Sequence, residues 1–214
     1  MRSRKGSNMD AKFSIDDPEA YLARIRELLD VRMRDNLRRR NHTLGVARTA
    51  AELAETYGVD PFLAEAAGLL HDWDKVLPDG ELMARAAQYG IRVAGSPIHA
   101  VPLLHGPVAA HELPELFPEL PAPVFQAVAR HTVGATDMTP LDMVVFIADA
   151  IEPMRCGAYA DDLRARVGAC DLQRLFFDCF TQGLVYVMQT GRYLYPTALD
   201  IYNSYALSCA GKKG

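Results

Sequence analysis

The stretch Gly68-Leu69-Leu70-His71-Asp72-Trp73-Asp74-Lys75 ends an apolar helical run with a histidine next to an aspartate. Adjacent side chains lie about 100° apart on a helix, so His71 and Asp72 can lean toward one point. Lys75 follows His71 by four residues and therefore shares its face. An imidazole and a carboxylate beside a cation suggest a metal that meets an anionic, phosphorylated substrate. Because such a pair is common by chance, its meaning depends on the rest of the chain.

Composition is that of an ordinary soluble protein, with 214 residues, 50% of them hydrophobic, and a formal net charge of −4. This balance argues against a general nucleic-acid binder. No run reaches the roughly 18 apolar residues of a membrane span, and no signal peptide is recognisable, so we expect a cytoplasmic protein. We also expect reduced cysteines, since their spacing contains no CxxC pair: Cys156, Cys170, Cys179 and Cys209.

Helical periodicity and helix-boundary residues recur along the chain, without a persuasive strand pattern or repeat. They predict an all-α bundle of about eight to ten helices. Residues 16–208 are expected to form a single domain between a disordered tail, 1–15, and a flexible C-terminus, 209–214. Helices are expected near 18–31, 37–57, 61–77, 80–89, 105–116, 124–131, 140–151, 172–190 and 197–207, with residues 91–104 as loop and 155–170 as loop with a helical turn.

Candidate metal ligands stand at or near the expected helix ends: His42, His71, Asp72, His105, His131 and Asp149. Imidazole and carboxylate without thiolate suit iron, manganese, nickel, cobalt or zinc. Six protein ligands exceed the number that one open mononuclear site needs, so Asp72 is placed to bridge two ions about 3.5–4 Å apart. The two remaining histidines are not expected to be ligands, because His99 lies in a proline-interrupted loop and His111 faces away from His105.

Five short sequence motifs together point to a known family. They are His42-Thr-Leu-Gly-Val-Ala47, Gly68–Lys75, Leu104-His-Gly-Pro-Val108, Arg130-His-Thr-Val-Gly134 and Phe146-Ile-Ala-Asp-Ala-Ile-Glu-Pro153. Together they resemble the HD-domain metal phosphohydrolases, an all-helical superfamily. More narrowly, their order is similar to that of the bacterial YqeK-type symmetrical bis(5′-nucleosyl)-tetraphosphatases. The resemblance extends over residues 17–207.

The resemblance implies a metal-dependent hydrolase that cleaves diadenosine tetraphosphate into two ADP, through metal-activated hydroxide at an iron-containing binuclear site. Asp72 is thereby a predicted catalytic residue shared by both ions. Carried over by position, one ion is held by His42, His71, Asp72 and Asp149, and the other by Asp72, His105 and His131.

Substrate contacts are expected from four residues. Lys75 is predicted to be catalytic, binding phosphate as a point charge or assisting the leaving oxygen. Arg155 is placed to clamp a phosphate in bidentate fashion, and Arg39 and Thr132 are weaker candidates. The basic cluster Arg38–Arg40 is either a solvated helix face or a local attractor for phosphates.

Two positions depart from the family's pattern. Asp74 stands where an apolar or small residue is common, and we expect it to face solvent, with pairing to Lys75 or a supporting role at the site as alternatives. Tyr195 stands where histidine is frequent, which leaves a substrate contact from the C-terminal segment open. Several aromatic residues are expected to pack along the last helices, and one or two could stack an adenine: Phe176, Phe177, Phe180, Tyr186 and Tyr193.

Alternative functions remain at this stage. One is an HD-type phosphohydrolase acting on nucleoside mono- or triphosphates, cyclic dinucleotides or alarmones. Another is a catalytically decayed nucleotide-binding regulatory domain, against which the presence of all six ligands argues. Association as a homodimer through the apolar C-terminal helices is compatible with each. Neither nucleic acid nor a membrane is expected as a partner.

Overall fold

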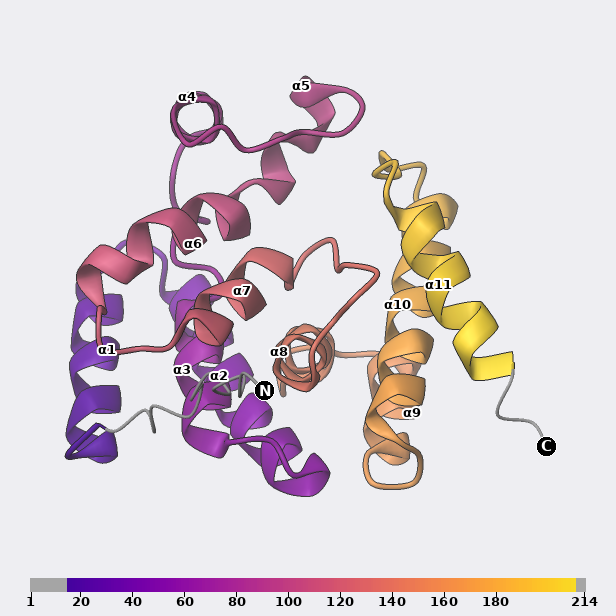
Figure 1. The fold of residues 1–214 in the computed structure, drawn as a ribbon, viewed down its shortest axis with the longest axis horizontal. Helices are drawn as coiled ribbons and strands as arrows, with labels where there is room; N and C mark the ends of the chain where they lie inside the picture. The colour runs from indigo at the N-terminus through magenta and orange to yellow at the C-terminus, as the bar shows by residue number, and fades with distance from the viewer. Residues whose placement is uncertain (1–14, 211–214) are drawn as a thin grey trace, which may run out of the picture.

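The computed structural model describes residues 15–210, which form eleven α-helices and one short 3-10 helix without any strand (Figure 1). The predicted all-α class is confirmed. The helices exceed the expected eight to ten because segments predicted as loop contain α5 (Pro97–Ala100), η1 (Val101–Leu103) and α9 (Ala158–Arg166). Prolines in the first turn start α5 and η1, since proline suits that position, whereas the sequence interpretation took them as interruptions.

Helix boundaries follow the capping signals. The N-cap side chains of α1 (Pro18–Arg32), α3 (Pro61–Leu70) and α8 (Pro140–Ile151) accept backbone N–H groups, and each helix then begins with proline. In α8 the cap is a complete capping box between Thr139 and Asp142. The α2 helix (Leu37–Tyr57) is capped by Asn36 and ends at Gly58, whose φ of 69° suits glycine.

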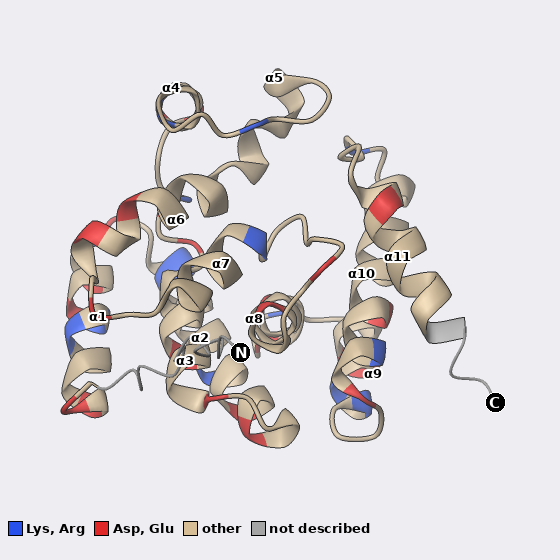
Figure 2. Cartoon of the chain, viewed as in Figure 1, with Lys and Arg blue, Asp and Glu red and all other residues tan. Residues whose placement is uncertain are grey.

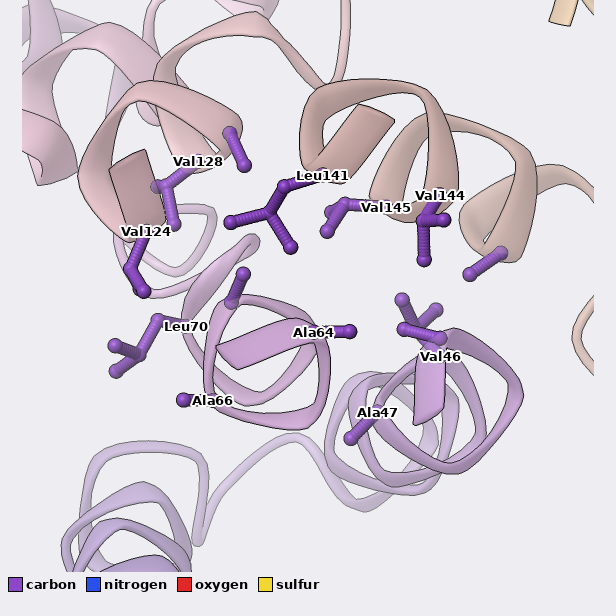
Figure 3. Packing of buried hydrophobic residues seen from close by; sticks show 14 of the residues in the cluster. Val46, Ala47, Ala64, Ala66, Leu70, Val124, Val128, Leu141, Val144 and Val145 are labelled. Atoms are coloured by element: carbon purple, nitrogen blue, oxygen red, sulfur yellow. The ribbon is translucent and has the colours of Figure 1, made fainter. Parts of the chain in front are cut away.

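The core lies where α2, α3, α7 (Ala122–Arg130) and α8 meet (Figure 3). Small side chains on α2 and α3 let these two helices approach closely, while valines from α7 and α8 fill the space above them. Labelled members of this packing are Val46, Ala47, Ala64, Ala66, Leu70, Val124, Val128, Leu141, Val144 and Val145. This packing brings the ends of four helices toward one another.

The remaining helices surround this core (Figure 1). α1 packs on α3, α6 (His105–Leu116) packs on α7, and α10 (Leu172–Gln189) joins α8 to α11 (Ala198–Ala210). α4 (Asp79–Gln88) packs with η1 and α6 around a second apolar cluster of five buried residues: Leu82, Ala86, Val101, Leu104 and Val108. That cluster anchors the segment that leads into α6.

Acidic and basic residues are interspersed along the helices (Figure 2). Among residues 15–210, no helix is long and apolar enough to cross a membrane. The three cysteines whose side chains are described are free: Cys156, Cys170 and Cys179. Of the aromatic residues expected to pack along the last helices, Tyr186 is instead exposed, with the Arg192 guanidinium over its ring.

Candidate metal centre

Helix ends bring the six predicted metal ligands together. His71 directly follows α3, His131 directly follows α7, and His105 begins α6. All of them are buried except Asp149, which is partly exposed. The set comprises His42 from α2, His71 and Asp72 from the turn after α3, His105, His131, and Asp149 from the last turn of α8.

Asp72 lies at the centre of this cluster, and its two carboxylate oxygens face different histidines. Oδ1 is 3.1 Å from His105 Nε2 and 3.8 Å from His131 Nε2. Oδ2 is 3.4 Å from His71 Nε2 and 3.7 Å from His42 Nε2. A carboxylate with one oxygen toward each pair of imidazoles has the arrangement needed to bridge two cations.

The candidate ligands form three groups of three residues. Within each group the nitrogen or oxygen atoms lie within 4.8 Å of one another, which is the spacing of ligands around one ion. Asp72 belongs to two of them, and the third combines residues that were assigned to different ions, so the division into two sites stays a prediction. The groups are His42 with His71 and Asp72, Asp72 with His105 and His131, and His71 with His131 and Asp149. Asp149 Oδ1 also lies 3.1 Å from His42 Nε2, so it faces the first of these sites.

Backbone carbonyls orient three of the four imidazoles. Each accepts from the ring nitrogen on the far side from Asp72, which assigns the proton to Nδ1 and leaves the lone pair of Nε2 facing the centre. These contacts join His71 Nδ1 to Gly68 O at 2.7 Å, His131 Nδ1 to Val128 O at 2.7 Å, and His105 Nδ1 to Pro102 O at 3.0 Å.

Glu152 orients the fourth imidazole, a role that the sequence interpretation missed. Its Oε1 lies 3.0 Å from His42 Nδ1, and its Oε2 accepts the Met154 N–H at 2.7 Å. The side chain is 1% exposed and packs on Gly45, where an added Cβ would lie 2.7 Å from Oε2. A carboxylate behind a histidine is a common support for a metal ligand. The sequence holds no local signal for this contact, because Glu152 and His42 are 110 positions apart.

Shifted pKa values favour the metal-binding charge state at four candidate ligands and oppose it at His71. Burial lowers the pKa of His105, and burial with the neighbouring His105 and His71 lowers the pKa of His131 to about 3, so both rings are neutral. Burial alone would raise the pKa of Asp72 and Asp149, but the surrounding imidazoles and, at Asp149, Arg155 hold both carboxyl groups well below their usual range. For His71, Asp72 outweighs burial and raises the pKa.

Buried imidazole nitrogens without a hydrogen-bond partner indicate that these residues fit metal ions. His42 Nε2 and His71 Nε2 are buried without a hydrogen-bond partner in the described structure. His105 Nε2 and His131 Nε2 lie 3.0 Å apart, with both Nδ1 atoms engaged by carbonyls. Lone pairs that converge in this way cost free energy unless a cation lies between them. Neutral imidazoles and ionised carboxylates are the ligands that transition metals require.

The predicted substrate-contact residues surround the cluster. Lys75 Nζ lies 2.9 Å from Pro102 O and 3.3 Å from His105 Nδ1. Arg39 Nη1 donates to Asp72 Oδ2 at 2.6 Å, and Arg155 Nη2 donates to Asp149 Oδ1 at 2.6 Å. Thr132 Oγ1 lies 3.0 Å from His131 Nε2. The structure thus places all four side chains in the shell around the proposed ions.

A polar cavity of about 460 Å³ opens beside His42, and we call it the arginine cavity. Its lining consists of Asn36, Arg38, Arg39, His42, Glu152, Met154 and Arg155. Arg40 instead pairs with Asp30 of α1 at 2.6 and 2.9 Å. Arg38 and Arg39 of the basic cluster therefore line the cavity, whereas Arg40 is ion-paired with a neighbouring helix.

Asp74 does not face solvent, so that prediction is wrong. Its side chain is fully buried and forms an ion pair with Arg32, the last residue of α1. Arg32 also donates to Trp73 O at 2.6 Å and lies over the Trp73 ring. The pair joins the end of α1 to the turn that carries Asp72. Local sequence could not reveal this partner, which lies 42 residues away.

His99 and His111 lie outside the cluster, in agreement with the spacing argument. His99 is exposed beside the ring of Tyr193, at a centroid distance of 5.3 Å. His111 is exposed and stacks on Tyr89 at 5.2 Å.

Comparison with known proteins agrees with this geometry. The HD domain family matches residues 39–154, which include all six candidate ligands. Symmetrical bis(5′-nucleosyl)-tetraphosphatases of Bacillus subtilis and Staphylococcus aureus are each 32% identical to the chain, over 76% and 80% of its length and 86% and 88% of theirs. A crystal structure of a predicted HD superfamily hydrolase involved in NAD metabolism, from Clostridium acetobutylicum, superposes with a TM-score of 0.79 at 28% identity, covering 87% of this chain and 97% of that one.

Proposed function

Because this chain belongs to the HD domain family and, within it, to the symmetrical bis(5′-nucleosyl)-tetraphosphatases, we propose that it hydrolyses diadenosine tetraphosphate to two ADP. The observation that carries the proposal is the central position of Asp72, with two imidazoles near each of its oxygens. Hydrolysis of a phosphoric anhydride needs an activated water and compensation of the phosphate charge, both of which a two-metal site supplies.

Two ions fit the residues present. His42, His71, Asp72 and Asp149 would hold one, and Asp72, His105 and His131 would hold the other. Bound there, the ions would activate water and offset the charge on the nonbridging phosphate oxygens. We propose iron as the metal, on the strength of the family resemblance and a donor set that lacks thiolates, with manganese, cobalt, nickel and zinc as the alternatives.

The side chains around the ions have separate roles in this proposal. Arg39 and Arg155 bind the nonbridging oxygens of the polyphosphate from the arginine cavity, because guanidinium matches phosphate geometry. Lys75, held beside His105 by Pro102 O, binds phosphate or assists the leaving oxygen from the other side. Thr132 donates a hydroxyl hydrogen bond near His131. Positioning and charge compensation are the main requirements of phosphoryl transfer.

Product analysis on anaerobically purified, metal-assayed protein tests the proposal. We expect ADP as the sole product from diadenosine tetraphosphate; ATP plus AMP would contradict symmetrical cleavage, and absence of turnover by the metal-loaded protein would contradict the activity. Asp72→Ala should lose both metal and turnover. The control Asp162→Ala removes an exposed carboxylate from α9 and should retain both. Equal metal content and activity in the two variants would place the site elsewhere.

Cytoplasmic location, association as a homodimer and the exclusion of nucleic-acid partners stay predictions. Size-exclusion chromatography with light scattering tests the second of these. The exposed Leu199 and Leu207 of α11 are suitable positions for charge-introducing variants, because their side chains are 63% and 77% exposed.

A further inference from the structure

A second cavity, of about 160 Å³, adjoins the metal centre, and we call it the apolar pocket. Its walls are formed by residues from η1, the segment after α7, α8, α10, the α10–α11 connection and the start of α11. They are Leu103, Thr132, Val133, Phe146, Phe180, Gly183, Leu184, Val187, Tyr193, Leu194, Tyr195 and Ala198. None of these side chains carries a charge, whereas three arginines line the arginine cavity. The two cavities therefore suit different parts of one ligand.

We propose that the apolar pocket binds one nucleobase of the substrate, an inference that rests on the proposed function. A cavity of about 150 Å³ is large enough for an aromatic ring, whereas sites for whole drug-sized ligands are about 300 Å³ or larger. The pocket therefore takes a base and leaves the ribose and phosphates outside. Its uncharged aromatic lining suits the faces of a heterocycle and excludes phosphate.

The pocket's position connects the base to the reacting phosphates. Thr132 lines the pocket, and its Oγ1 lies 3.0 Å from His131 Nε2 and 3.4 Å from His105 Nε2. Phe146 lines it from α8, three residues or nearly one helical turn before Asp149. A nucleotide with its base in the pocket thus directs its phosphates toward the proposed ions and the arginine cavity beyond them.

Aromatic packing holds one wall in place. The Phe146 and Phe180 rings lie 6.1 Å apart, and the Phe176 ring packs edge-on against Phe146 at 5.1 Å. Phe180 also contacts the chain at Gly134, where a Cβ would lie 3.6 Å from its ring. A preformed wall lowers the entropy lost when a flat ring enters.

Two tyrosines from the α10–α11 connection also line the pocket, and the backbone of segment 94–96 holds their hydroxyls. The Tyr193 and Tyr195 hydroxyls accept backbone N–H groups of Ser96 and Ala94, each at 2.9 Å. A phenol that accepts one bond still has its O–H to donate, and ring nitrogens of a base are acceptors. The two contacts also fasten segment 94–96 to the C-terminal part of the chain. Tyr195, which departs from the family's pattern, thereby has a place in base recognition.

Filling the pocket from α10 tests this assignment without touching a metal ligand. At Gly183 an added Cβ meets nothing within 4 Å, so Gly183→Leu can extend into open space at the pocket wall. The matched control Gln182→Leu adds the same side chain one residue earlier, at an exposed position that faces a different cavity. Metal content and thermal stability are measured for both variants.

Calorimetric binding of ADP and of inorganic pyrophosphate to the metal-loaded protein provides the readout. Since stacking of one base changes affinity about tenfold to a hundredfold, Gly183→Leu should weaken ADP binding by that factor and leave pyrophosphate unchanged. Gln182→Leu should change neither. Should Gly183→Leu not fold, Val187→Phe, from the next turn of α10, narrows the same pocket and repeats the test.

Unchanged ADP affinity in a folded pocket-filling variant would overturn the inference. Equal weakening of ADP and pyrophosphate would do so as well, because it would indicate a disturbed metal centre. Since ADP binding requires no turnover, the outcome is separate from the product analysis. A protein that binds ADP through the pocket but leaves diadenosine tetraphosphate intact would contradict the proposed function alone.

Discussion

Gly68→Ala is the most informative single substitution, because Gly68 lies where α3 passes closest to α2. A Cβ built at this position would lie 2.6 Å from Ala47 Cα, 3.0 Å from Ala47 N and 3.3 Å from Val46 C. These are backbone atoms, which cannot rotate away as a side chain can. The two helices carry or precede the ligands His42 and His71, so the substitution tests packing and site geometry together.

The magnitude follows from the size of the overlap. Ordinary contact begins at 3.4 Å, so α2 and α3 must move about 0.8 Å apart at their crossing. Alanine inside a helix normally stabilises by about 1 kcal/mol relative to glycine, whereas overpacking of a core costs about 1–3 kcal/mol. These two effects give a net loss of up to about 2 kcal/mol in the free energy of unfolding. Because Gly68 O orients His71, we also expect metal affinity to fall about tenfold.

Urea denaturation measures the first effect and chelator competition the second. Gly183→Ala is the matched control, since this glycine also lies inside a helix but its added Cβ would meet nothing within 4 Å. The free energy of unfolding of this control should rise by about 0.5–1 kcal/mol, and its metal affinity should stay unchanged. If Gly68→Ala were as stable as Gly183→Ala and bound metal normally, the close crossing of α2 and α3 would not be what positions the ligands.

Three further predictions concern the residues behind the site. Arg32→Met leaves the Asp74 carboxylate unpaired and should lower the free energy of unfolding, measured by urea denaturation, by about 3 kcal/mol. The double variant Arg32→Met/Asp74→Leu should recover most of that loss, and a double variant as unstable as the single one would refute the pairing. Burial raises the pKa of Asp74 from 3.8 to about 6, so the folded state favours the protonated carboxyl. The stability of the wild type relative to Asp74→Asn should therefore fall as pH rises from about 4 to about 6, and a constant difference would contradict this. Glu152→Ala should weaken metal binding about tenfold to a hundredfold by chelator competition, and Glu152→Gln much less because its amide oxygen can still accept from His42; equal losses would indicate a role for charge alone.

Local signals in the sequence predicted nine of the eleven α-helices within residues 15–210 and nominated the candidate ligands, although the helix expected over 61–77 ends at Leu70. The Thr139 side chain accepts an N–H three residues later, and the Gly58 N–H donates to Ala54 O four residues earlier, so both caps define helix boundaries without reference to the rest of the chain. Short sequence motifs around the histidines likewise identified the HD domain family. The same local reasoning misread segment 91–104, because a proline that interrupts one helix also suits the first turn of another.

Only the tertiary structure decided which side chains support the ligands. Asp74 is buried because α1 returns Arg32 to the turn after α3, and Glu152 reaches His42 across 110 residues of sequence. The division between the arginine cavity and the apolar pocket likewise depends on how α8 packs on α2 and α7 and how α10 packs on α8. Such contacts arise from long-range packing, whose partners leave no periodic or capping signal at either residue. The sequence therefore nominated the candidate ligands, and the fold determined which side chains contact them and where the two cavities lie.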